Sequence, residues 1–311
     1  MKAMQATVSA PAAAPAGKTD KKRASRRRKH RAPGAFFVIK TIMFIVFALY
    51  AFTLLYALVF ALSISFKDQW MYPGANQVGW PDPWVWTNYT EAWLNLETAH
   101  TGMIGMFFNS LWYAGGGAFL GVAVSSMVAY VVAKYRFPGG KFLYGLAIFT
   151  MTLPIVGAFP SQYRVYEILG ISNTPFLLLT KAGGFGFNFV VLYSFFKSLP
   201  WTYAEAAQID GAGHFRTFLQ VMMPQATGVI MALFLVAFIG QWNDYQFPIL
   251  FLKDYPTLSS GLYIYQIEQV RETNYPVLFA GLIISIIPVI ILYIAFQNTL
   301  MDMQLSGGLK G

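Results

Sequence analysis

Six apolar blocks of the sequence are each long enough to cross a lipid bilayer, and they limit the fold more than any other feature. They lie at 36–66, 107–133, 142–160, 176–196, 228–252 and 277–296. A hydrocarbon core of about 30 Å needs roughly 20 helical residues. Only helices or closed barrels can span it, and continuous rather than alternating apolar runs predict helices. The predicted fold is therefore all-α, a polytopic membrane protein with six transmembrane helices.

The composition agrees with a membrane protein. Hydrophobic residues make up 56% and charged residues 11% of the 311 residues, which is unusual for a soluble domain. The chain contains no cysteine, and this excludes disulfides and cysteine-based zinc sites.

Basic residues gather on one side of the predicted helices. With the N-terminus in the cytoplasm, the segments 1–40, 134–141 and 197–224 and the C-terminal tail hold 17 of the 22 Lys and Arg residues. Cytoplasmic loops of membrane proteins carry such an excess. We therefore expect both termini, and the loop at 198–224, to be cytoplasmic.

Residues 1–34 differ from the rest of the chain. An Ala- and Pro-rich stretch leads to the run KKRASRRRKHR, which cannot bury enough apolar surface to offset the entropy of ordering. We expect a disordered basic segment that holds the first helix against anionic membrane lipid. No nucleic-acid partner is expected, because no aromatic residues are interleaved with this run and no folded module follows it.

The loop between the fourth and fifth blocks contains EAAQIDGAGHFRTFLQVMMP. It resembles the signature loop of the inner-membrane permease subunits of binding-protein-dependent ABC importers, which runs Glu-Ala-Ala, three residues, Gly, nine residues, Ile-x-Leu-Pro. The matching positions are Glu205, Ala206, Ala207, Gly211 and Pro224. Val221 and Met223 replace the signature Ile and Leu and keep apolar bulk.

The resemblance implies a type I ABC importer permease fold over residues 35–311, in the bacterial inner membrane. It also implies a coupling loop at 198–224 whose short helix docks on a separate ATPase. The implied coupling residues are Glu205, Ala206, Ala207, Asp210, Gly211 and Pro224. The implied partners are a second permease subunit, an ATP-binding cassette ATPase dimer, an extracytoplasmic solute-binding protein, the solute and membrane lipid. ATP and Mg²⁺ would bind the ATPase, so this chain is expected to hold no cofactor and to be no enzyme.

Polar side chains interrupt the fifth apolar block in the stretch QWNDYQFP. Gln241, Asn243 and Asp244 lie there, and Asn109 lies near the start of the second block. Polar groups at membrane depth usually face a bundle interior or a cavity. Two interpretations stay open: these residues line a solute pathway, or they form hydrogen bonds between helices.

The sequence also narrows the function by what it lacks. Gly139, Gly140 and Lys141 lead into Phe142 rather than into Ser or Thr, so no P-loop is formed. The histidines are scattered and form no catalytic or metal-binding motif. The resemblance, including the Asn88–Tyr89 pair after the first block, favours the branch that imports sugars and oligosaccharides, the maltose-type second permease. Alternatives are a glycerol-phosphate or polyol permease and, less favoured, a stand-alone secondary transporter, for which inverted repeats would be expected.

Overall fold

The computed structural model describes residues 33–72, 77–153, 157–268 and 273–308. We predicted disorder for residues 1–34. Of these, residues 1–32 lie outside the described residues, and residues 33 and 34 are the first two of helix α2. The chain divides into two compact units, Met1–Leu58 and Val59–Gly311. The described part of the first unit is the greater part of one helix, and the second unit contains all the other elements.

Three helices among the described residues are long and apolar enough to cross a membrane. They are α2 (Pro33–Ser65), the run formed by α4 (Met103–Ser110), η2 (Leu111–Gly116) and α5 (Gly117–Lys134), and α15 (Tyr275–Gly308). A fourth span results if the segment His214–Gln225 and α12 (Thr227–Trp242), which meet at a bend of 79°, are one broken span. These lengths are compatible with six spans but do not confirm the count.

The third and fourth apolar blocks differ from the continuous helices that we expected. The third contains α6 (Gly140–Thr152) and the start of α7 (Ala158–Ile168), with 154–156 outside the described residues. The fourth begins with the 3₁₀ helix η3 (Pro175–Lys181), and α8 (Phe187–Ser198) follows only after a break. The break contains three glycines, which are poor helix formers. The apolar content of a block therefore does not show whether its helix is continuous.

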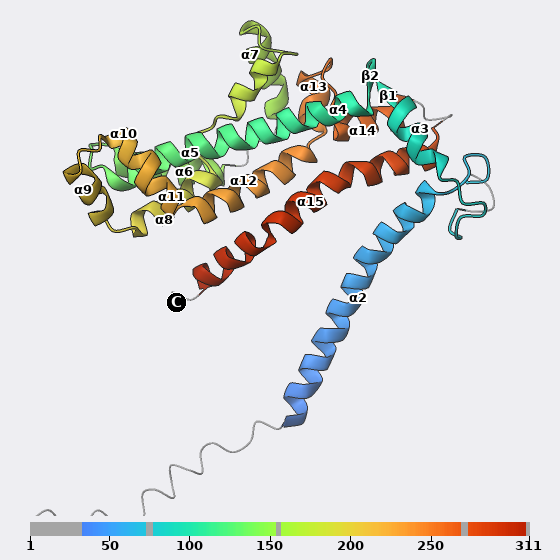
Figure 1. The fold of residues 1–311 in the computed structure, drawn as a ribbon, viewed down its shortest axis with the longest axis horizontal. Helices are drawn as coiled ribbons and strands as arrows, with labels where there is room; N and C mark the ends of the chain where they lie inside the picture. Colours follow the sequence, from blue (N-terminus) through green and yellow to red (C-terminus); the bar gives the residue numbers. More distant parts are fainter. Residues whose placement is uncertain (1–32, 73–76, 154–156, 269–272, 309–311) are drawn as a thin grey trace, which may run out of the picture. The chain divides into compact units, whose positions relative to one another are not determined.

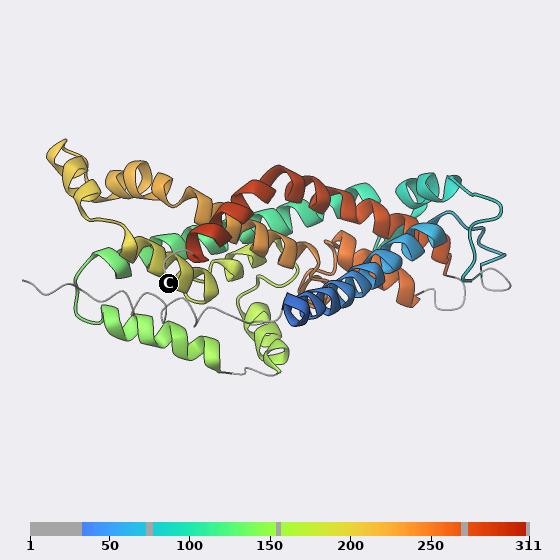
Figure 2. The ribbon, with the colours of Figure 1, turned by 90° about the horizontal axis from the view of Figure 1, so that it is seen from below.

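Within the second unit, α12 lies between α5 and α15, and α5 packs along α8 (Figure 1). The two ends of this group carry different short elements, as Figures 1 and 2 show. One end has α9 (Thr202–Ile209), α10 (His214–Thr217), η4 (Phe218–Met222) and α11 (Met223–Gln225). The other end has α3 (Thr87–Asn95), the antiparallel pair β1 (Glu97–Thr98) and β2 (Thr101–Gly102), α13 (Gln246–Phe251) and α14 (Leu258–Glu268). We call them the loop end and the hairpin end.

Each end has its own apolar core. At the loop end, Phe189, Phe196 and Met222 are fully buried. At the hairpin end, Met103 and Met106 of α4 pack with Leu262 of α14 and Leu278 of α15. Outward-facing apolar side chains are common on the helices, as at Phe142 on α6, which is 70% exposed. Such surfaces fit contact with lipid or with another subunit.

Candidate functional site

Helix α9 at the loop end has an inward and an outward face. Ala204 and Ala207 are buried, whereas Glu205 and Ala206 are exposed. The small inward side chains let α9 lie close to η4, which it contacts. Ala207 therefore packs on its own chain, and Glu205 and Ala206 remain accessible to a partner.

Helix α9 ends in a Schellman turn. The Gly211 N–H donates to the Gln208 carbonyl at 3.0 Å, and the Ala212 N–H donates to the Ala207 carbonyl at 2.9 Å. Gly211 has φ +82°, a left-handed conformation that residues with a β-carbon resist. Gly211 thus sets the direction in which the chain leaves α9, and Asp210 lies exposed beside it.

Beyond this turn the chain bends into α12. Pro224 lies exposed in α11, and its carbonyl accepts a hydrogen bond from Thr227 Oγ1 at 2.9 Å, across the bend. The six predicted coupling residues are therefore not one surface. Glu205, Ala206 and Asp210 are exposed around α9, Ala207 faces inward, and Gly211 and Pro224 shape the two turns.

Sequence reasoning missed three large apolar side chains of this loop. Ile209 is 86% exposed, Phe215 is 68% exposed and Tyr203 is 46% exposed. The available signal was Ile209 itself, a large apolar residue close to Glu205, Gln208 and Asp210 in the sequence. His214 Nδ1 and the Tyr135 hydroxyl lie 3.0 Å apart in a hydrogen bond that ties the loop to the end of α5.

Asp244, just after α12, joins several elements of the hairpin end. Its Oδ2 accepts a hydrogen bond from the Tyr113 hydroxyl at 2.8 Å, and its Oδ1 accepts one from the Phe247 N–H at 3.1 Å. Its backbone carbonyl accepts a hydrogen bond from Ser259 Oγ at 2.9 Å. Lys181 Nζ lies 3.8 Å from the centroid of the Phe247 ring. Tyr113 and Lys181 belong to this polar cluster, although no sequence motif pointed to either residue.

The side chains of the other predicted polar residues form no hydrogen bond with this cluster among the described residues. Asn109 Nδ2 donates to the Pro256 carbonyl at 3.0 Å, and Asn243 Nδ2 donates to the Ile239 carbonyl at 2.8 Å. Gln241 Oε1 is buried against Gly117 and has no hydrogen-bond partner among the described residues. The side-chain amides of Asn109 and Asn243 thus bond to backbone carbonyls of the same chain.

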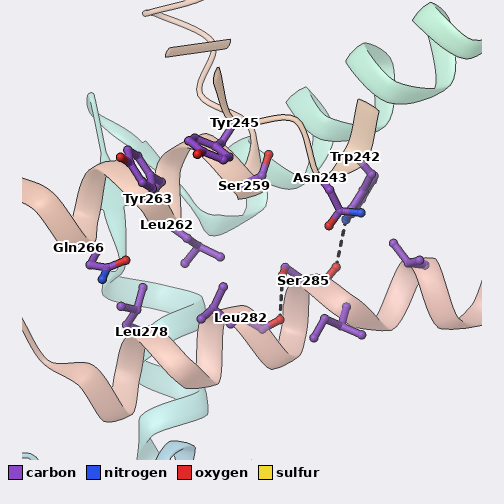
Figure 3. Close-up of a pocket in the computed structure, with 12 residues that line it drawn as sticks. Trp242, Asn243, Tyr245, Ser259, Leu262, Tyr263, Gln266, Leu278, Leu282 and Ser285 are labelled. Atoms are coloured by element: carbon purple, nitrogen blue, oxygen red, sulfur yellow. Dashed lines mark hydrogen bonds between the residues drawn. The ribbon is translucent and has the colours of Figure 1, made fainter. Parts of the chain in front are cut away.

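A cavity of about 260 Å³ lies between the end of α12, α14 and α15 (Figure 3). Its polar lining comprises Asn243, Tyr245, Ser259, Tyr263, Gln266 and Ser285. The rings of Tyr245 and Tyr263 have centroids 4.6 Å apart. Trp242 Nε1 donates to the Ser285 carbonyl at 3.1 Å, which holds α12 against α15 beside the cavity. The described residues include no group of three or more His, Cys, Asp or Glu side chains placed to hold a metal ion.

Comparison with known proteins agrees with this architecture. Residues 121–301 match the family described as binding-protein-dependent transport system inner membrane component. The chain is 35% identical to the permease protein of a diacetylchitobiose uptake system from Streptomyces coelicolor, over 70% of this chain and 72% of that protein. It is 27% identical to a melibiose/raffinose/stachyose import permease protein from Bacillus subtilis, over 72% and 80% of the two chains.

Two further relatives extend the comparison. An sn-glycerol-3-phosphate transport system permease protein from Yersinia enterocolitica is 29% identical over 70% of this chain and 79% of that protein. A bacterial ABC transporter involved in the import of the acidic polysaccharide alginate contains a chain with the same fold, at a TM-score of 0.69 and 22% identity, covering 87% of this chain and 98% of that one. The chain belongs to the family of inner-membrane permease components of binding-protein-dependent transport systems.

Proposed function

We propose that this permease imports a sugar or an oligosaccharide as one half of a translocation pathway, paired with a second permease subunit. An extracytoplasmic solute-binding protein delivers the solute, and a separate ATP-binding cassette ATPase dimer binds ATP and Mg²⁺. This chain supplies no catalytic group. Relatives named for diacetylchitobiose and for melibiose, raffinose and stachyose support a carbohydrate. The relative named for glycerol-3-phosphate keeps that solute class as the alternative.

The geometry of α9 is the observation that carries this proposal. Its outward face offers a carboxylate at Glu205 and an apolar side chain at Ile209, and both are exposed. A charge-assisted hydrogen bond beside an apolar anchor is a combination that suits docking on another protein. We therefore assign the ATPase contact to Glu205, Ala206, Ile209 and Asp210.

Movement of α9 would reach the hairpin end through rigid elements. Ala204 and Ala207 hold α9 on η4, and η4 continues through α11 into the bend before α12. Asp244 and Trp242 then tie the far end of α12 to η2, α14 and α15. A displacement of α9 by the ATPase would thus shift α12 as a body, as in rigid-body transport mechanisms.

The cavity at the far end of α12 is our candidate for solute contact. Aromatic faces at Tyr245 and Tyr263, with the amides of Asn243 and Gln266 at its two ends (Figure 3), suit a polar ring with hydroxyl groups. Asn109 and Asp244 are assigned instead to hydrogen bonds between elements, and Gln241 stays open between the two roles. The loop end faces the cytoplasm in this proposal, together with both termini.

The test is uptake by the complete complex reconstituted in vesicles, compared with this chain alone. We expect solute uptake only with the ATPase, the second permease, the binding protein and ATP present. The variant Glu205→Ala should reduce uptake and ATPase retention, because a lost charge-assisted bond costs about 1.5–3 kcal/mol. Uptake by this chain alone, driven by an ion gradient and indifferent to Glu205→Ala, would show a secondary transporter instead.

A further inference from the structure

A cavity of about 1030 Å³ lies at the loop end, where α5 ends, α6 begins and α8 turns towards α9. It is separate from the exposed face of α9 and from the cavity beside Asp244. Its volume is at the upper end of the range of about 300–1,000 Å³ for small-molecule sites. A free phosphate ion would leave most of this space unfilled.

The charge of this cavity has one sign. Of the described residues that line it, none is acidic, and four are basic: Lys134, Arg136, Lys141 and Lys197. Lys134 Nζ donates to the Leu199 carbonyl, and Lys197 Nζ lies 5.3 Å from the centroid of the Tyr193 ring. Arg136 and Lys141 are exposed at the cavity and available to an anion.

The remaining walls are apolar and aromatic. Phe137, Tyr193 and Trp201 line the cavity, and the Trp201 ring packs edge-on against Tyr135 at a centroid distance of 5.9 Å. Tyr and Trp are typical of the boundary between headgroups and acyl chains. Beside the cavity, α6 exposes Phe142 along its outer face. A basic pocket thus opens next to an exposed apolar surface.

We propose that this cavity binds the headgroup phosphate of an anionic phospholipid. Arg136 and Lys141 pair with the phosphodiester, and the acyl chains follow the apolar surface of α6. The assignment to the cytoplasmic leaflet rests on the orientation given under Proposed function, whereas the site itself depends neither on the solute nor on the coupling role of α9. An acidic surface of the ATPase is the rival occupant, and the apolar walls favour lipid.

The experiment measures quenching of Trp201 fluorescence by brominated lipid. The full chain, purified in mixed micelles, is titrated with brominated phosphatidylglycerol or brominated phosphatidylcholine, and the Trp201→Phe variant is subtracted to isolate the Trp201 signal. Native mass spectrometry of retained phosphatidylglycerol is a second readout that needs no Trp variant. The test pair is Arg136→Gln with Lys141→Gln. The matched control is Arg164→Gln with Lys253→Gln, which removes two exposed charges outside the cavity.

We expect phosphatidylglycerol to quench Trp201 at lower concentration than phosphatidylcholine does. Each charge removed from the cavity should weaken this binding about fivefold, and the control pair should not.

Equal quenching by the two lipids, or equal weakening by the control pair, would overturn the proposal. So would displacement of the lipid by excess inorganic phosphate, which would indicate a site for free phosphate. Unchanged lipid binding with loss of the ATPase from the Arg136→Gln, Lys141→Gln complex would assign the cavity to the ATPase. Uptake is measured separately from lipid binding. The lipid site can therefore be wrong while the proposed transport function holds, and the reverse is also possible.

Discussion

The Tyr113 hydroxyl donates a hydrogen bond of 2.8 Å to Asp244 Oδ2, joining residues 131 positions apart in the sequence. The contact links the π-helical segment η2 to the end of α12. The Asp244 carboxylate also accepts a hydrogen bond from the first turn of α13, and its backbone carbonyl accepts one from Ser259 of α14, so a single residue holds several elements together. Asp244 therefore stabilises the arrangement of elements at the hairpin end, and its hydrogen bonds are explained without a contact to the solute.

The first prediction concerns this pair. Tyr113→Phe and Asp244→Ala should each lower the thermal stability of the purified permease, because hydrogen bonds to charged groups contribute about 1.5–3 kcal/mol. The double variant should lose less than the sum of the two, since both remove the same contact. Tyr144→Phe is the control. The Tyr144 ring packs on Tyr193 at the loop end, and this variant should change the thermal stability little. Full additivity of the two changes would contradict a shared contact.

The second prediction separates the two faces of α9. Ala207→Leu should destabilise the permease by about 1–3 kcal/mol, because Ala207 is only 9% exposed and extra bulk overpacks its surroundings. Ala206→Leu, on the exposed face, should leave stability unchanged and reduce the amount of ATPase that co-purifies. Thermal denaturation and co-purification measure the two effects. If both variants behaved alike in the two assays, the assignment of faces would be wrong.

The third prediction tests the turn after α9. Gly211→Ala should cost about 1–2 kcal/mol, because Gly211 has φ +82° and a β-carbon disfavours this conformation. Gly213→Ala is the matched control two residues later, where φ is −68° and alanine fits. We expect only Gly211→Ala to lower uptake and ATPase retention, since it redirects the chain between α9 and α10. Similar losses from Gly213→Ala would show that the loop responds to any added bulk.

Local sequence patterns predicted the helical elements better than their contacts. The apolar blocks predicted α2, α5, α12 and α15, and the Glu-Ala-Ala spacing located α9. The break before α8 was missed because the fourth block was judged by its apolar content, although three glycines lie within it. The partner of Asp244 was hidden for a different reason: Tyr113 is brought to it only by tertiary packing, which no local spacing encodes.

The same limit applies to the coupling loop. The spacing places Ala206 and Ala207 together, yet one is exposed and the other faces inward. Which of the two is buried depends on where α9 contacts η4, and the chain reaches η4 through the turn at Gly211. Exposed apolar residues such as Ile209 were missed because an isolated apolar residue in a loop is unremarkable until its helix face is known.

The fourth prediction concerns topology. With 17 of the 22 basic residues on the proposed inner side, reporters fused after Lys141 and at the C-terminus should both be cytoplasmic, and a reporter after Thr101 should be external. Thr101 is the first residue of β2, directly after the turn of the β1–β2 hairpin. An external C-terminal reporter would contradict six spans with both termini in the cytoplasm.

The fifth prediction tests solute contact at the cavity beside α12. Tyr263 is 40% exposed there and its ring faces Tyr245, so Tyr263→Ala removes an aromatic wall without opening a buried core. We expect the KM for uptake to rise about fivefold, corresponding to a lost contact of roughly 1 kcal/mol, with ATPase retention unchanged. Tyr293→Ala on α15 is the control, because Tyr293 is exposed and lies outside the cavity lining. Tyr263 lies at the hairpin end, away from α9. If the KM stayed unchanged and solute no longer stimulated ATP hydrolysis, the cavity would transmit movement between the two ends rather than bind the solute.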